Sequence, residues 1–319
     1  MRPNLALLCC VAAAVAQDRP FRTEIRVVQV PVTVTNEKGA HVEGLKPADF
    51  KVFDDGHPRQ IALDTFGTGF APISLAIAVQ TSGLSKPAVA KIRRIGSLIV
   101  PLVIGRRGEA AILTFSDDIQ WRLDFTGDSQ AIQKTIRGIP TGESNQAHLL
   151  DAVVDVADAM KERKGRRVLL LISESRDRGS RVKLEDAIRA VEREGVEVFA
   201  ATYSAQATAW TARPEDLPPP TGTNYFAVFT EMARMGKTNH TIALTQATGG
   251  AQYPFLHEQT IEKAIETLGV DVHAQYILSF PQPAGAEGMH EITVSLPNRA
   301  DVRIRSRQAY WAEHIGASK

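Results

Sequence analysis

The chain has 319 residues, of which 44% are hydrophobic and 23% are charged, as is typical of a folded globular protein. Its 37 Lys and Arg residues nearly balance its 36 Asp and Glu residues, so the formal net charge is +1. This composition excludes a disordered, fibrous or polytopic membrane chain. It also lacks the basic excess typical of nucleic-acid binding, and we expect no nucleic-acid partner.

Residues 1–16 have the pattern of a secretory signal peptide. A basic start precedes an apolar run over 5–15, and the small residues of 14–16 fit a cleavage site. Because a bilayer needs about 20 apolar residues, we expect an exported, periplasmic or extracellular protein that does not span a membrane. The two cysteines, Cys9 and Cys10, both lie in this segment, so the mature chain should contain no disulfide. Lipidation at either cysteine is the alternative, but no Leu-small-small pattern precedes them.

Residues 17–69 are predicted to form an N-terminal β module. Over 25–34, β-branched residues alternate with polar residues for much of the length, as expected of a half-buried strand. Asp55-Gly56 is typical of a tight hairpin turn, and we expect residues 60–66 to form the returning strand.

From residue 70 to 272 the sequence alternates between helix and strand patterns. Continuous apolar runs such as 73–79 and 168–172 are typical of strands that are covered on both faces. Stretches with apolar residues at three- and four-residue spacing lie between such runs. This alternation predicts right-handed βαβ crossovers and a doubly wound, mostly parallel α/β sheet.

The last part of the chain departs from this alternation. Residues 205–224, with Trp210 and several prolines, are predicted to form a long loop. A helix ending at Gly249-Gly250, a short strand and another helix follow. Residues 273–319 are predicted to be a C-terminal β segment whose last two expected strands, 291–296 and 302–307, form a hairpin.

Motifs spread over nearly the whole mature chain carry a family resemblance. They lie at 30–34 (VPVTV), 45–53, 55–56 (DG), 73–82, 168–173, 247–250 (ATGG) and 275–278 (QYIL). On these residues the chain resembles the von Willebrand factor A-related domain proteins of the exported bacterial, acidobacterial type. The resemblance implies a Rossmann-like domain with an N-terminal β extension and a C-terminal helix and hairpin. It also implies a metal-ion-dependent adhesion site, where an Asp-x-Ser-x-Ser turn, a Thr and a second Asp hold a divalent cation for a partner's acidic residue.

Carried over by this resemblance, most ligand positions depart from the family pattern. The positions concerned are Gln80 for the first Asp, Ser82 and Leu84 for the two Ser with Ser85 adjacent, Ala147 near the Thr, and Glu174 for the last Asp, with Asp177 three residues on. Gln80 removes an anionic ligand and Leu84 removes a hydroxyl. We therefore expect a degenerate site, with neither Mg²⁺ nor another cofactor. No His pair at zinc-ligand spacing occurs in the chain.

The expected function is a non-enzymatic, adhesion-type interaction with a protein partner. Arg176 or Arg178 could receive a partner carboxylate in place of the ion, although a solvated loop explains these arginines as well. Trp210 could contribute to the same face or belong to a protective insertion. One alternative is an exported hydrolase that uses Glu174 and Asp177 as acid and base. Another is a structural subunit of a cell-envelope assembly. The sequence leaves the partner and the oligomeric state open.

Overall fold

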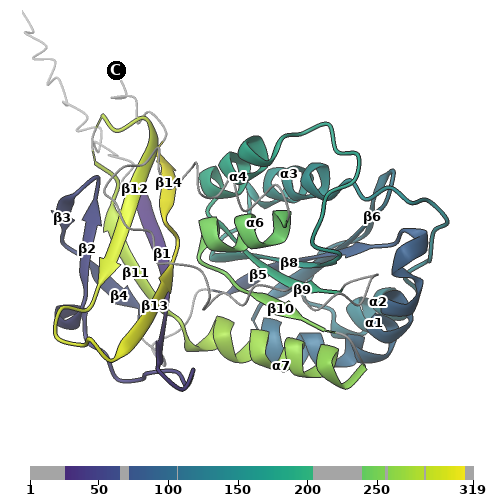
Figure 1. Ribbon diagram of the computed structural model, residues 1–319, viewed down its shortest axis with the longest axis horizontal. Coiled ribbons are helices and arrows are strands. Elements are labelled where there is room, and N and C mark those ends of the chain that lie inside the picture. Colours follow the sequence, from purple (N-terminus) through teal and green to yellow (C-terminus); the bar gives the residue numbers. More distant parts are fainter. Residues whose placement is uncertain are drawn as a thin grey trace, which may run out of the picture.

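The computed structural model describes residues 26–64, 72–105, 107–203, 239–255, 258–283 and 285–312. Within these ranges the chain forms an α/β domain and a β-sandwich that lie side by side (Figure 1). The expected signal segment 1–16 and the expected Pro-rich loop 205–224 lie outside the described residues. Among the described helices, none combines the length and the apolar character needed to cross a bilayer.

The α/β domain is built on a six-stranded sheet of order β10-β9-β8-β5-β6-β7. Its strands are β5 (Ile73–Gln80), β6 (Glu109–Phe115), β7 (Ile119–Thr126), β8 (Arg166–Ser173), β9 (Val196–Thr202) and β10 (Gln252–Pro254). Every neighbouring pair is parallel except β6 and β7. The chain moves outward in one direction from β5 through β6 and in the other through β8. The predicted doubly wound, mostly parallel sheet of von Willebrand A-like type is therefore confirmed.

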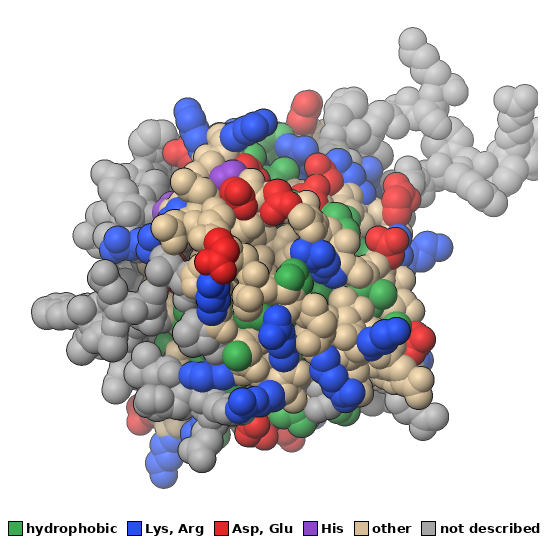
Figure 2. All heavy atoms as spheres, turned by 90° about the vertical axis from the view of Figure 1, so that its right-hand side faces the viewer, with side chains coloured by type: hydrophobic (Ala, Val, Ile, Leu, Met, Phe, Trp, Pro, Cys, Tyr) green, Lys and Arg blue, Asp and Glu red, His purple; other side chains and the backbone are tan. Residues whose placement is uncertain are grey.

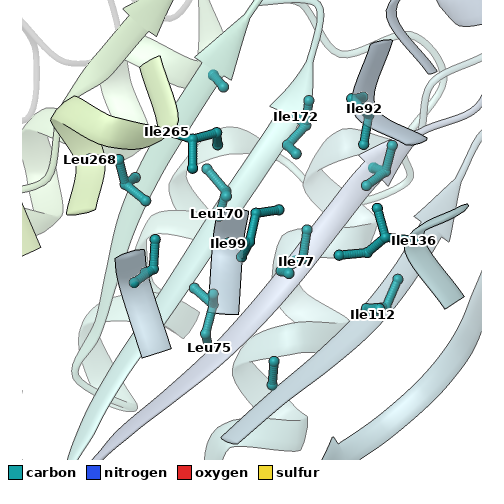
Figure 3. Close-up of a cluster of buried hydrophobic side chains, with 14 of the residues drawn as sticks. Leu75, Ile77, Ile92, Ile99, Ile112, Ile136, Leu170, Ile172, Ile265 and Leu268 are labelled. Atoms are coloured by element: carbon teal, nitrogen blue, oxygen red, sulfur yellow. The ribbon is translucent and has the colours of Figure 1, made fainter. Parts of the chain in front are cut away.

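Helices cover both faces of this sheet. One face carries α1 (Lys86–Ile99), α2 (Ser129–Arg137) and α7 (Glu258–Ala274), and the other carries α3 (Leu149–Met160), α4 (Leu184–Arg193) and α6 (His240–Thr248). The short helix η2 (Gly83–Ser85) precedes α1, and the π-helical turn η3 (Val100–Ile104) follows it. Figure 3 shows strand residues such as Ile77 and Leu170 packed against Ile99 and Ile265 of the helices. Because both faces are covered, all eight residues of β5 are buried, which explains why only Ser74 and the terminal Gln80 in this strand are polar.

The second body is a sandwich of two four-stranded sheets, with orders β13-β1-β11-β4 and β14-β12-β2-β3. Its elements are β1 (Val27–Asn36), η1 (Pro47–Asp49), β2 (Lys51–Asp54), β3 (His57–Arg59), β4 (Ala62–Asp64), β11 (Tyr276–Pro281), β12 (Gly288–Ser295), β13 (Val302–Ser306) and β14 (Ala309–Ala312). Strands from both ends of the described chain pair in each sheet. Their inward side chains, including Val30, Val32, Leu278 and Phe280, form one core. The N-terminal β module and the C-terminal β segment thus share one hydrophobic core.

Two turns of the sandwich test the sequence expectations. Asp55-Gly56 joins β2 to β3 with positive φ angles of 49° and 76°, which confirms the predicted tight hairpin turn. The predicted returning strand over 60–66 is wrong: the two-residue turn lets β3 (His57–Arg59) pair with β2 at once, and β4 (Ala62–Asp64) pairs with β11 in the opposite sheet. The expected C-terminal hairpin is wrong in its pairing. β12 pairs with β2 and β14, whereas β13 pairs with β1 in the opposite sheet. The connection 296–301 is long enough to cross between sheets, which lets both strands bury their inner faces in the shared core.

The sandwich docks on the amino-terminal end of the parallel strands. Arg166 begins β8, and its guanidinium donates to Glu197 of β9 at 3.2 Å and to the carbonyl of Val272 at 2.6 Å. Gln275 lies against both Arg166 and Glu197 and donates to Thr33 of β1 at 3.3 Å. The carboxyl ends of the strands therefore lie at the opposite end of the α/β domain, away from the sandwich.

Candidate functional site

The candidate site lies where the chain order of the sheet reverses, between β5 and β8. Gln80 is the last residue of β5, and Glu174 directly follows β8. The Gln80 Oε1 atom accepts a hydrogen bond from the backbone N–H of Glu174 at 2.9 Å. In doubly wound sheets, loops diverge at such a reversal and leave a crevice at the carboxyl ends of the strands. The structure therefore brings together two of the residues that the sequence assigned to the site.

The bond to Glu174 fixes the orientation of the Gln80 amide. Because Oε1 faces a backbone donor, Nε2 faces the other way and donates to the Ser82 hydroxyl at 2.8 Å. Ser82 and Ser85 share a hydrogen bond of 2.9 Å, and the Tyr203 hydroxyl donates to Ser85 at 2.7 Å. The side chains of Gln80, Ser82 and Ser85 are buried. These groups form one buried chain of hydrogen bonds, which we call the Gln80 network.

Tyr203 completes this network and was missed in the sequence. It directly follows β9, so its place at the carboxyl end of a parallel strand is the signal that could have identified it. Burial strongly raises the pKa of its hydroxyl; the Ser85 hydrogen bond lowers it slightly, and the nearby Glu174 raises it further. The hydroxyl therefore stays protonated and keeps its role as a donor across the physiological pH range.

Glu174 and Arg178 form the rim of the network. The Glu174 carboxylate is 8% exposed, and its Oε2 lies 3.3 Å from Nη2 of Arg178, whose side chain is 44% exposed. The backbones of Arg178 and Ala147 exchange two hydrogen bonds of 2.9 Å. The loop after β8 is therefore joined to the segment before α3, and Arg178 is the charged group of the rim that faces solvent.

Asp177 has a structural role at the start of α3. Its carboxylate accepts hydrogen bonds from the Leu150 backbone N–H at 3.2 Å and from both the hydroxyl and the backbone N–H of Ser180. The backbone N–H of Asp177 donates to Nδ1 of His240 at 3.1 Å. Burial lowers the pKa of His240, Asp177 raises it and Arg176 lowers it, so the neutral, accepting form of the ring is favoured. Asp177 is thus a capping residue rather than a member of the Gln80 network.

Three other sequence-assigned residues are placed as follows. Leu84 lies in η2 between Ser82 and Ser85 along the chain. Arg176 lies exposed in the same loop as Arg178. Trp210 lies outside the described residues.

A second group of potential metal ligands lies in the sandwich and was not identified in the sequence. Asp54, Asp55 and His290 each offer one ligand atom within 4.8 Å of the others. Asp54 is buried and paired with Arg59 at 2.7 Å, while His290 Nδ1 lies 2.8 Å from Asp55. Because the Asp residues and His290 are far apart in the chain, only the pairing of β2 with β12 brings them together.

Comparisons with known proteins were made by sequence and by fold. No family model matches the chain, and no curated protein sequence matches it. Among solved structures, the conserved hypothetical protein BatB from Bacteroides thetaiotaomicron is 15% identical, with a TM-score of 0.44 over 63% of this chain and 98% of that chain. Proximal thread matrix protein 1 from the mussel byssus is 12% identical, with a TM-score of 0.49 over 70% of this chain and 50% of that one.

The matrix protein has also been solved with a zinc-occupied MIDAS motif. The vWF domain of the pili tip protein Mfa5 from Porphyromonas gingivalis is 14% identical, with a TM-score of 0.31 over 34% of this chain and 40% of that chain. At these low sequence identities, the comparisons indicate a similar fold and nothing about function. The strand order of the central sheet and the helices on both its faces give the α/β domain a von Willebrand A-like fold.

Proposed function

We propose that this chain is an exported, non-enzymatic protein-interaction module, a von Willebrand A-related protein of the exported bacterial type. It binds its partner through the loops at the carboxyl end of the sheet, without a bound ion. The observation that supports this most directly is the Gln80 network. The Gln80 amide stands where the family resemblance places a carboxylate ligand. It donates a hydrogen bond to the Ser82 oxygen, which in the family pattern would coordinate the cation.

The residues present do not fit a divalent cation. Hard cations require several oxygen ligands, preferably anionic ones. Here the Ser82 and Ser85 hydroxyls already bond to Gln80, to Tyr203 and to each other. Ala147 has no side-chain oxygen, and the Glu174 carboxylate faces Arg178. We therefore derive no step of partner binding through a metal at this site.

In this proposal Arg178 supplies the positive charge that the ion supplies in the family. A guanidinium can donate two parallel hydrogen bonds to a carboxylate, and Arg178 is exposed enough to reach one on a partner. Its contact with Glu174 holds the guanidinium at the rim. The partner group that we expect is therefore an Asp or Glu side chain.

The hydrolase alternative has little support in the geometry. The Glu174 Oε2 atom has no hydrogen-bond partner among the described residues, although it lies 3.3 Å from Nη2 of Arg178. The Asp177 carboxylate, which would have to be the second catalytic group, is occupied by capping hydrogen bonds. A general base needs a free lone pair directed at a substrate proton. The cell-envelope subunit differs from a transient binder mainly in how long the contact lasts, and native mass spectrometry of the captured complex would separate the two.

The test is capture of partner proteins from the exported fraction by the immobilised chain, followed by a binding titration with the partner identified. We expect binding to persist in excess EDTA. We also expect Arg178→Glu to weaken it by at least about tenfold, the usual scale for reversing a contacting charge. Arg299→Glu, which changes an exposed arginine of the sandwich paired with Asp301, is the matched control and should have no effect. Loss of binding in EDTA, or equal affinity of the Arg178 variant, would contradict the proposal.

A metal titration must separate the two candidate sites. If the mature chain binds Mn²⁺ or Zn²⁺, the Asp54, Asp55 and His290 group is the site to examine first. His290→Ala should abolish such binding, whereas Ser85→Ala should leave it unchanged. The reverse pattern would show that the Gln80 network accepts a cation after all.

A further inference from the structure

The near-neutral charge of the whole chain conceals a basic region on the α/β domain. α1 contains four basic residues and α2 contains two, and neither helix contains an acidic residue. Figure 2 shows the end of the α/β domain away from the sandwich, and its lower part carries mostly Lys and Arg side chains. The two helices lie in the lower right of Figure 1, at the level of this basic region. Charge on this molecule is therefore segregated, although its sum is close to zero.

A hollow lies within this region, between β7 and the C-terminal end of α2. It has a volume of about 350 Å³. Its lining combines two cationic side chains, Arg122 and Lys134, with the hydroxyl of Thr135 and the apolar groups of Ala131, Ile139 and Pro140. No acidic side chain lines it. The lining of the hollow is thus positively charged in its ionisable groups and apolar in much of the rest.

The two cations are held in different ways. Arg122 donates from Nε to the Thr114 hydroxyl at 2.9 Å. This anchors the guanidinium, and its terminal N–H groups have no hydrogen-bond acceptor among the described residues. Lys134 is exposed on α2. The Arg122 guanidinium is therefore fixed, whereas the Lys134 side chain can change its conformation. Both groups can reach a carboxylate in the hollow.

The C-terminal end of a helix normally repels anions because its last carbonyls are unpaired. Here most of those carbonyls are occupied. The Gly138 N–H donates to the carbonyls of Lys134 and Thr135, and Arg93 of α1 donates from Nε to the carbonyl of Ile139 at 2.8 Å. Backbone N–H groups thus occupy three of the last four carbonyls of α2, and Arg93 brings a positive charge to the Ile139 carbonyl just beyond the helix, which offsets part of the negative potential at this place.

We propose that this hollow binds an acidic peptide segment of a partner protein, with a carboxylate on Arg122 and Lys134 and an apolar side chain against Ala131 and Pro140. The mixed lining favours a peptide over other polyanions. Nucleic acid is held by many phosphate contacts and by aromatic platforms. Insertion into an anionic membrane requires exposed large hydrophobic groups, and the described residues expose only Val27 and Val270 in this class. This hollow is separate from Arg178 and the Gln80 network. The peptide-binding proposal and the proposed function can therefore be refuted independently.

The test is fluorescence anisotropy with a fluorescein-labelled octapeptide of alternating Glu and Leu, compared with the same peptide carrying Gln in place of Glu. We expect saturable binding of the Glu peptide only, weakened by added salt. Arg122→Gln and Lys134→Gln should each reduce affinity at least about fivefold, as loss of one charge-assisted contact does. Arg189→Gln, which removes an exposed arginine of α4, is the matched control and should have no effect.

Several results would overturn the proposal. One is equal binding of the Glu and Gln peptides or the absence of binding by both. Another is unchanged affinity in the Lys134 variant, which alters an exposed side chain and should fold normally. A third is that the chain binds another polyanion more tightly than it binds the Glu peptide, and that the Arg122 and Lys134 variants abolish this binding. The two polyanions to test are an oligothymidylate of about 20 nucleotides and vesicles with about 30% phosphatidylserine. Arg178→Glu should leave peptide binding unchanged, which separates this result from the proposed function.

Discussion

At the scale of single residues, Gln80 decides the chemistry of the candidate site. Its amide satisfies two buried groups at once, the backbone N–H of Glu174 and the hydroxyl of Ser82. An Asp at this position could accept the N–H but could not donate to a hydroxyl in its ionised form. The amide therefore allows the network to form without an ion. Its N–H group occupies the Ser82 oxygen that would otherwise coordinate a cation.

We predict that Gln80→Leu destabilises the protein by about 1–3 kcal/mol, since it leaves the buried Glu174 N–H without an acceptor and removes one of the two hydrogen bonds of Ser82, which keeps its bond to Ser85. Urea denaturation followed by circular dichroism measures this free energy. Gln130→Leu, at an exposed position of α2, is the control and should change the free energy of unfolding by less than about 0.5 kcal/mol. Equal stability of the two variants would mean that the network does not hold the loops together.

At the scale of elements, the packing of α4 against β14 contains a buried carboxyl group. Glu192 of α4 is 2% exposed, and among the described residues neither of its side-chain oxygens has a hydrogen-bond partner. Burial raises the pKa of this group to about 8, although Arg307 and Arg189 act to lower it. Arg307 donates instead to the backbone carbonyl of Glu192 at 3.1 Å. The carboxyl is therefore protonated in the folded protein at neutral pH.

This protonation predicts a pH-dependent stability. In the unfolded chain Glu192 ionises near its ordinary pKa of 4.5. The folded state then binds one more proton than the unfolded state, so stability falls as pH rises from 4.5 to about 8. Glu192→Gln should match the wild type near pH 4.5 and exceed it at pH 8 by about 4 kcal/mol, since each of the pKa units between 4.5 and about 8 corresponds to about 1.4 kcal/mol. Denaturant titrations at both pH values measure this.

The control is Glu185→Gln at an exposed position of the same helix, whose stability curve should run parallel to that of the wild type. A parallel curve for the Glu192 variant as well would show that the buried carboxyl is ionised in the folded protein.

At the scale of the whole molecule, buried polar groups join the sandwich to the α/β domain. Arg166 and Glu197 are buried against Gln275, as described above. Asp271 of α7 contacts His41 at 2.9 Å and accepts from Arg305 of β13 at 2.8 Å. Burial alone would raise its pKa, but the hydrogen bond from His41 and the charge of Arg305 lower it to about 2. Separating the two bodies would leave several of these charges without partners, which is costly.

We therefore predict that the two bodies unfold together. Trp121 of β7 reports on the α/β domain, and Trp311 of β14 reports on the sandwich. In a Trp210→Phe background, two variants that each retain one of these tryptophans should show fluorescence transitions with the same urea midpoint and slope. Two distinct midpoints would show that the sandwich and the α/β domain are energetically independent.

The central sheet was the most predictable part of the fold. Its strands are covered on both faces, so their apolar runs and the helical periodicity between them are local signals. β7 was not predicted, although Ile119, Trp121, Leu123 and Phe125 alternate with more exposed residues as an edge strand requires. The pairing of the sandwich could not be predicted, because β1 and β11 are separated by more than two hundred residues and nothing local records their register.

The sequence by itself predicted the doubly wound α/β class, because periodicity is encoded locally, whereas the site positions Gln80, Ser82, Ser85 and Glu174 came from the family resemblance. Only the tertiary structure decided that Tyr203 completes the network, that Asp177 caps a helix, and that both ends of the chain build one sandwich. It also decided that Arg122 and Lys134 share one hollow. Each of these depends on contacts between segments distant in the chain, whose geometry follows from packing rather than from local sequence.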